Sequence, residues 1–125
     1  MITKAQELGQ AAEDRAAEYL LSLGWRIIAR NVKNNYGELD IVALDGDYEL
    51  VIVEVRARTL GQMQSPLDSI GTRKLRALLR ASTQYVDSIE WAKFWRIDVV
   101  GITMNRKAPG DWELEHVKDI TAGML

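Results

Sequence analysis

GELDIVALDGDYELVIVEVRAR, residues 37–58, contains two runs rich in Val, Ile and Leu on either side of an Asp-Gly-Asp turn at 45–47. This composition predicts a hairpin with strands at 38–44 and 48–58. Four charged residues interrupt the apolar runs: Glu38, Asp40, Glu54 and Arg56. Buried carboxylates are costly unless they are paired or bind a metal, so these charges are the first candidates for a functional site.

The register of this hairpin decides how its charges are arranged. Partners in an antiparallel pair share a face, so an even sum of partner numbers brings Asp40 and Glu54 together. The even register also gives one apolar face, formed by Leu39, Ile41, Ala43, Val51, Val53, Val55 and Ala57. An odd register would distribute charge over both faces. We therefore predict the even register, a turn of three residues with a bulge, and one cluster of charges at an end of the opposite face.

A helix is predicted over residues 4–23, because Thr3 and Gln6 have capping-box spacing and Gly24 suits a left-handed helix end. Its apolar face is expected to contain Ala5, Leu8, Ala12, Ala16, Tyr19 and Leu23. Glu13 lies on the shoulder of that face, where a boundary carboxylate can reach water.

The rest of the chain predicts a mixed sheet. We expect a strand at 25–31, a loop at 32–36, a polar connector at 59–64, a helix from Pro66 or Thr72 to about Asp87, a strand at 94–103, a loop at 105–111 and an edge strand at 112–117. Helix, three strands, helix and two strands give an α/β fold whose sheet is covered by two helices. A single domain of residues 1–125 is expected.

A row of basic residues marks the second predicted helix. Arg73, Arg76 and Arg80 recur at helical spacing with Lys74 beside them. Such a row can follow a nucleic-acid backbone, and an ordinary solvated helix face is the alternative. Arg58 points the same way as Arg56 and could serve either the acidic cluster or a phosphate.

Three further polar residues are given structural roles. Arg96 and Asp98, two residues apart in one strand, are expected to pair with each other or with neighbours. His116 is expected to be a surface or capping residue.

Composition excludes several classes of site. The chain of 125 residues has no cysteine and one histidine, which excludes a disulfide scaffold, a thiol nucleophile and a histidine-based metal cage. It has no apolar run of about 20 residues and no signal-peptide core, so a cytoplasmic protein without a membrane span is expected. A net charge of −2 argues against coating nucleic acid by bulk charge but permits a local basic groove.

The acidic cluster suits a hard cation. Asp40 and Glu54 could ligate Mg²⁺, which takes one or two protein carboxylates together with water and substrate phosphate. An internal salt-bridge network of Glu38, Asp40, Glu54 and Arg56 is the alternative. Three carboxylates with one cation leave excess negative charge, which a metal would offset.

These segments, in this order, carry a resemblance. GELD and VEVRAR, with Glu13 on an upstream helix, resemble the D…ExK signature of the restriction-endonuclease-like (PD-(D/E)XK) nucleases. The chain resembles more closely the bacterial YraN family, which is related in fold to archaeal Holliday-junction resolvases. This closer resemblance also rests on GQAAEDRAAEYLLSLGWRIIARN, Pro66, Lys74, WRIDVV and His116. Met63-Gln64 and Ile97 differ from the aromatic-glycine pair and the phenylalanine usual there, as loop or packing variation would.

The resemblance implies a restriction-endonuclease-like fold and a role for each matching residue. Asp40, Glu54 and the carbonyl of Val55 would hold Mg²⁺ or Mn²⁺, Glu13 would meet the metal or its water, and Glu38 would support the site. Arg56 stands in the place of the superfamily lysine. Arginine stays charged, so Arg56 could position water or stabilise an anion but could not act as a base.

The expected function is therefore metal-dependent hydrolysis of DNA phosphodiesters, with structured or branched DNA as a fitting substrate. A nucleic-acid-binding module that keeps the fold without the reaction is the alternative, favoured by Arg56. An interaction protein with a purely structural acidic cluster is a third. Dimerisation suits an enzyme that cuts two strands, although no stretch of the sequence requires it.

Overall fold

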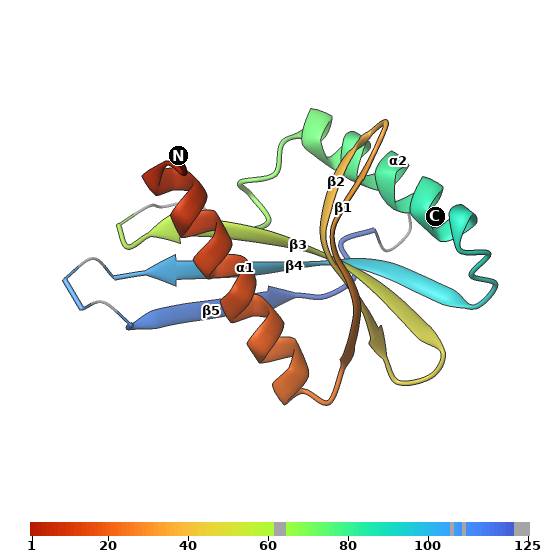
Figure 1. Ribbon diagram of the computed structural model, residues 1–125, viewed down its shortest axis with the longest axis horizontal. Helices are drawn as coiled ribbons and strands as arrows, with labels where there is room; N and C mark the ends of the chain where they lie inside the picture. Colours follow the sequence, from red (N-terminus) through yellow and green to blue (C-terminus); the bar gives the residue numbers. More distant parts are fainter. Residues whose placement is uncertain (62–64, 106, 109, 122–125) are drawn as a thin grey trace.

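The computed structural model describes residues 1–61, 65–105, 107–108 and 110–121. Its elements are α1 (Lys4–Ser22), β1 (Arg26–Asn34), β2 (Gly37–Asp45), β3 (Glu49–Thr59), α2 (Thr72–Ser88), β4 (Phe94–Met104) and β5 (Trp112–Val117) (Figure 1). Met63-Gln64, and with them part of the predicted connector, lie outside the described residues, as do two positions of the loop predicted at 105–111.

The five strands form one mixed sheet in the order β1-β2-β3-β4-β5. Strands β3 and β4 are parallel and the other neighbouring pairs are antiparallel. Helix α2 connects the parallel pair, which needs a crossover rather than a tight turn. This is the predicted α/β fold, a mixed sheet flanked by two helices, and it is consistent with a restriction-endonuclease-like fold.

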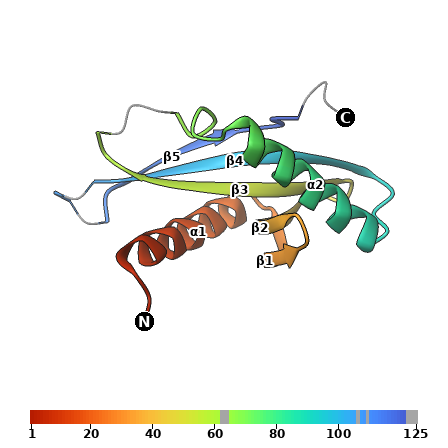
Figure 2. The same cartoon turned by 90° about the horizontal axis from the view of Figure 1, so that it is seen from above.

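The two helices cover separate cores. Helix α1 buries Ala12, Ala16, Ala17 and Leu20 with β-strand residues such as Val53, whereas α2 buries Leu78, Ala81 and Val86 with residues such as Ile52. Figure 1 shows α1 lying obliquely across the strands of the sheet, and Figure 2 shows α2 on the opposite side, beside the β1–β2 hairpin. Ile97 is fully buried in the α2 core, in agreement with packing variation. No helix in the described part of the chain is long and apolar enough to cross a bilayer.

The α1 prediction was correct in position and partly wrong in its face. The Thr3–Gln6 capping box is present, and the helix ends at Ser22, before Gly24 with φ +85°. Ala5 and Leu23, expected inside, are exposed: the buried residues of α1 begin only at Ala12, and Leu23 is the C-cap that follows the last helical residue. For the second helix, the structure selects Thr72 over Pro66 as the start.

The predicted register of the β2–β3 hairpin is confirmed. Ile41 pairs with Val53 and Asp45 with Glu49, so every sum is even, and three residues form the turn. The turn lies at 46–48, one residue later than predicted, and begins at Gly46 with φ +74°. Glycine adopts this left-handed conformation without steric cost.

Two local predictions were wrong. The loop predicted at 32–36 is mostly strand, because β1 continues to Asn34 and pairs Lys33 with Glu38. Cross-strand pairing here overrides the turn preference of the asparagines. Leu39, expected beside Ile41, packs in the α2 core instead. Leu39 and Val42 therefore lie on the same face of the sheet, although regular alternation would put them on opposite faces. The alternation of side chains in β2 is thus interrupted at residues 40–41, where its pairing with β3 begins; we call this interruption the turn-over of β2.

Candidate functional site

The turn-over in β2 places Asp40 between two strands. The Asp40 carboxylate accepts a hydrogen bond from the backbone N–H of Val55, with Oδ2 2.9 Å from the nitrogen. In a regular antiparallel pair, the Val55 N–H would bond to a backbone carbonyl of β2, and here the Asp40 side chain takes the place of that carbonyl. Asp40 therefore lies at the edge of β3 beside the next acidic residue, Glu54.

Glu54 is a buried carboxylate with an unsatisfied oxygen. The residue is only 4% exposed, and its Oε2 has no hydrogen-bond partner in the described part of the chain. Burial, followed by the negative charge of Asp40, raises the pKa of Glu54 from 4.5 to about 8, against the opposing effect of the Lys74 charge. Two neighbouring carboxylates with one raised pKa are a common feature of catalytic and metal-binding sites.

Lys74 approaches this pair from the first turn of α2. Its Nζ lies 3.7 Å from Glu54 Oε2, close enough for an ion pair and too far for a hydrogen bond. The sequence grouped Lys74 with the basic row. Lys74 follows Arg73 by one residue, so its side chain points about 100° away around the helix axis. This difference in direction is the signal in the sequence that could have separated Lys74 from the arginines.

Arg56 is held by the connector that precedes α2. Its Nε donates to Ser69 Oγ at 3.0 Å and its Nη2 to the Ser69 carbonyl at 3.1 Å. Pro66 of the same connector packs on Gly101 of β4, where a Cβ would lie 2.0 Å from Pro66 Cγ. The positive charge of Arg56 also lowers the pKa of Glu54, after the larger effects of burial, Asp40 and Lys74.

Glu13 and Glu38 form a second acidic group. The Asn31 amide bridges them, with Nδ2 2.9 Å from Glu13 Oε2 and 3.0 Å from Glu38 Oε1. Arg30 Nε donates to Glu13 Oε1 at 3.0 Å. Asn31 adopts a left-handed φ of +52°, which asparagine tolerates and which identifies a position of local strain. No pattern in the sequence had indicated a role for Asn31.

This second group changes two expectations. Glu13 is buried instead of reaching water at the helix boundary, because Arg30 and Asn31 of β1 donate hydrogen bonds to its two carboxylate oxygens. Glu38 bonds to Asn31, and Arg56 to Ser69, so neither the single cluster of four charges nor a closed salt-bridge network among them is observed. Among the described residues, no three His, Asp or Glu side chains come together closely enough to hold one metal ion.

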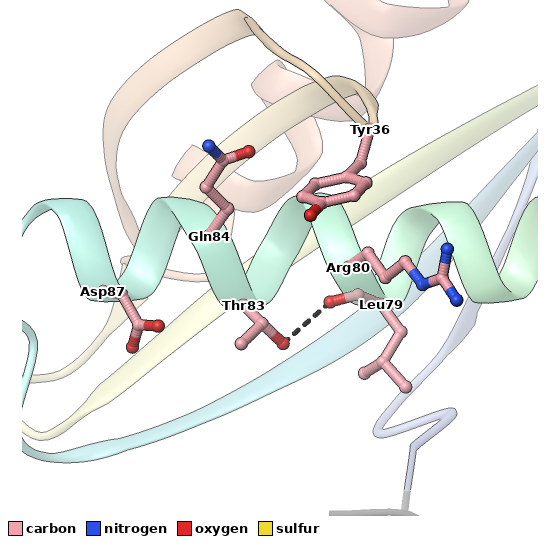
Figure 3. A pocket seen from close by; sticks show the side chains of 6 residues that line it. All are labelled: Tyr36, Leu79, Arg80, Thr83, Gln84 and Asp87. Carbon is pink, nitrogen blue, oxygen red and sulfur yellow. Dashed lines mark hydrogen bonds between the residues drawn. The ribbon is translucent and has the colours of Figure 1, made fainter.

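The basic row borders a groove beside the β1–β2 turn. Arg73, Arg76 and Arg80 line a hollow of about 560 Å³ with Tyr36. A second hollow, of about 520 Å³, shares Tyr36 and Arg80 with the first and continues along α2 to Asp87 (Figure 3). Arg58 lies elsewhere, half-buried, with its Nε 3.0 Å from Thr103 Oγ1.

A buried polar network joins β4, β5 and α1. Arg96 Nε lies 3.0 Å from Asp98 Oδ1, as the predicted pairing requires. His116 Nε2 lies 2.8 Å from Asp98 Oδ2, and its Nδ1 lies 2.8 Å from the Tyr19 hydroxyl. The surface role expected for His116 is wrong, because β5 turns this side chain toward Trp25 and α1, where it is 6% exposed.

Comparison with known proteins gives a consistent family match. The model of an uncharacterised protein family, UPF0102, matches residues 12–102. A UPF0102 protein of Chlorobium chlorochromatii is 36% identical over 116 residues, which cover 90% of this chain and 89% of that protein. One of Marinobacter nauticus is 43% identical over 79% of this chain and 80% of its own. Another, of Herpetosiphon aurantiacus, is 34% identical over 97% of this chain and 98% of its own.

Proposed function

The chain belongs to the uncharacterised protein family UPF0102, and because that description assigns no activity, we propose a function from the acidic site: metal-dependent hydrolysis of phosphodiester bonds in DNA. The family agrees with the YraN resemblance of the sequence. Placement within the restriction-endonuclease-like nucleases is part of the same proposal, and structured or branched DNA is the expected substrate.

One observation carries the proposal. Glu54 keeps a buried oxygen without a hydrogen-bond partner among the described residues, directly beside the Asp40 carboxylate. A carboxylate pair in this environment destabilises the fold unless a proton or a cation offsets its charge. Retaining such a pair in the centre of the sheet is physically reasonable where a ligand supplies that cation.

The residues present fit a divalent metal. Asp40, Glu54 and the Val55 carbonyl offer the oxygen ligands that Mg²⁺ and Mn²⁺ prefer. When bound, the metal would polarise the scissile phosphate and lower the pKa of a water molecule. Glu13 and Glu38 are proposed to support the site through Asn31, which ties the β1–β2 hairpin to α1 next to Asp40.

The cations around the pair have separate proposed roles. Lys74 Nζ, 3.7 Å from Glu54, lowers the pKa of that carboxylate and so favours its charged form, and it is placed to exchange a proton with water at the site. Arg56, fixed by Ser69, supplies a permanent positive charge for the phosphate oxygens. Lys74 thereby compensates for arginine at the position of the superfamily lysine.

The test is cleavage of end-labelled single-stranded, duplex and four-way-junction DNA with Mg²⁺ or Mn²⁺. The wild-type protein should cut at least one substrate, and Asp40→Asn and Glu54→Gln should remove cutting. Glu18→Gln, at an exposed position of α1, is the matched control and should cut normally. Cutting that survives in both site variants would refute the assignment. Binding without any cutting would support the non-catalytic module instead.

A further inference from the structure

The groove between the β1–β2 turn and α2 has an aromatic wall and a cationic edge. Tyr36, at the turn, is 48% exposed and borders both hollows. Figure 3 shows its ring lying over α2 near Arg80. Leu79 and Ala77 contribute apolar surface below it. The groove therefore presents a flat ring and an apolar floor directly beside positive charges.

Asn34 holds the backbone of the turn that carries the ring. The Asn34 amide donates to the Ala81 carbonyl of α2 at 3.0 Å, and its side-chain oxygen accepts from the Tyr36 backbone N–H at 3.0 Å. One side chain thus attaches the turn to the helix and orients the residue that carries the ring. A platform ordered in advance loses less conformational entropy when a ligand binds.

The arginines lead from this platform to the acidic pair. Arg73, Arg76 and Arg80 are exposed, and none of them has an ion-pair partner in the described part of the chain. They span about 10 Å of helix. The N-terminal end of the row adjoins Lys74, which contacts Glu54. A polyanion lying along the row would therefore reach the acidic pair at that end.

We propose that this groove binds an unpaired segment of nucleic acid, with one base stacked on Tyr36 and its phosphates on Arg73, Arg76 and Arg80. The inference rests on the proposed function, since it names the strand on which the acidic pair acts. Stacking on a protein ring requires a base that has left its own duplex, and it is tolerant of sequence. Asp87 at the far end of the groove repels phosphate and limits the site in that direction.

The charge arrangement favours nucleic acid over an acidic peptide. Helix α2 has cations and no acidic residue in its first turn, although the positive end of the helix dipole disfavours cations there. A run of anions along the groove would offset this repulsion. Tyr36 adds a ring face to the cationic row, and every nucleobase can stack on such a face.

The experiment measures binding of labelled single-stranded DNA of about ten nucleotides, with a chelator present so that no cutting occurs. The variants are Tyr36→Leu and Tyr36→Phe, and each oligonucleotide has a matched abasic version. Tyr36→Leu should weaken binding roughly tenfold or more, whereas Tyr36→Phe should bind as the wild type does. The abasic strand should show no difference between the two variants. Arg76→Gln should weaken binding of both strands and lower the salt dependence.

Equal affinity of Tyr36→Leu and wild type for the intact strand would overturn the inference, as would equal binding of a duplex. Displacement by a glutamate-rich peptide that is independent of Tyr36 would assign the groove to a protein partner instead and overturn it too. Glu18→Gln, at an exposed position of α1, should bind as the wild type does, and the chelator keeps this assay independent of cutting, which separates the two proposals. Failure of cutting with Tyr36-dependent binding retained would reject the nuclease alone.

Discussion

Glu54 is the residue on which the chemistry of the acidic site depends. It sits in a parallel strand pair at the centre of the sheet, where its neighbours are aliphatic. Asp40 adds negative charge beside it, and Lys74 adds positive charge at 3.7 Å. A single position thus combines burial, a neighbouring like charge and an oxygen without a hydrogen-bond partner among the residues that the structure describes, and each of these properties can be changed by one substitution.

The first prediction concerns stability and pH. The pKa of Glu54 is raised from 4.5 to about 8, so between these values the folded chain holds a proton that the unfolded chain releases. The free energy of unfolding without metal should therefore fall as pH rises from about 4.5 to about 8. Glu54→Gln should remove that fall and be more stable than the wild type near pH 9, by a few kcal/mol, since each pH unit is worth up to about 1.4 kcal/mol.

Urea unfolding with a chelator, at about pH 5 and about pH 9, measures this effect. Glu18→Gln, whose side chain is 71% exposed, is the control and should follow the wild type at both values. An equal change in the free energy of unfolding between the two pH values for wild type and Glu54→Gln would show that Glu54 does not hold the proton.

The second prediction separates Lys74 from the basic row. Lys74→Gln should lower cutting on the order of 100-fold with little change in DNA affinity, because its ammonium lies at Glu54. Arg76→Gln, one exposed cation further along α2, should do the reverse: weaken affinity and leave the saturated cutting rate unchanged. Single-turnover kinetics across DNA concentrations measure both. Equal losses of saturated rate in the two variants would contradict separate roles.

At the scale of elements, α2 and the connector before it organise the site. Helix α2 supplies Lys74 to the acidic pair and the arginines to the groove. The connector supplies Ser69 to Arg56 and rests on Gly101 through Pro66. Strand β4, whose Gly101 is the register partner of Arg56, thereby also influences the Arg56 side chain through the connector. A glycine in the middle of a buried strand usually marks such a close approach.

The third prediction tests this close approach. A Cβ at residue 101 would lie 2.0 Å from Pro66 Cγ and 2.6 Å from its Cβ, so Gly101→Ala must displace the connector. We expect a loss of about 1–3 kcal/mol of stability, together with reduced cutting as Arg56 loses Ser69. Pro66→Gly removes both clashing atoms and should recover much of this loss in the double variant. A double-mutant cycle by urea unfolding measures the coupling, and additive losses would refute the contact.

The fourth prediction concerns the network that joins β4, β5 and α1. Asp98 is fully buried, and its carboxylate is hydrogen-bonded to the side chains of Arg96 and His116 and to the backbone N–H of Asp119. Asp98→Ala should cost about 3–5 kcal/mol, because Arg96 keeps a buried charge without its main partner. Glu49→Gln, at a partner of Arg96 that is 31% exposed, should cost far less. Thermal unfolding distinguishes them, and similar losses would show that Asp98 is not central.

At the scale of the whole molecule, metal binding should appear as global stabilisation. A ligand that binds only the folded state raises its stability with the logarithm of free concentration. Mn²⁺ at pH about 8 should therefore raise the Tm of the wild type, by displacing the proton of Glu54. Asp40→Asn should lose the increase. An equal Tm rise in Asp40→Asn would place the binding elsewhere.

Local sequence patterns determined much of this protein. Apolar runs gave the strands, the capping box gave the start of α1, and the parity of Asp40 and Glu54 gave the hairpin register. These features depend on neighbours within a few residues or on one turn, so the chain itself specifies them. The same patterns indicated the carboxylate pair, because charges inside apolar strands are visible in sequence.

Tertiary packing alone decided the surroundings of that pair. The turn-over of β2 moved Leu39 to the α2 core and separated Glu38 from Glu54. Lys74 reached Glu54, His116 was buried and Tyr36 was placed on α2 by contacts between residues 20 to nearly 100 positions apart in sequence. Side-chain periodicity fixes which face a residue occupies within its own element, but not which element covers that face. Only the assembled sheet and helices supply those partners, because burial and charge pairing are set by the whole fold.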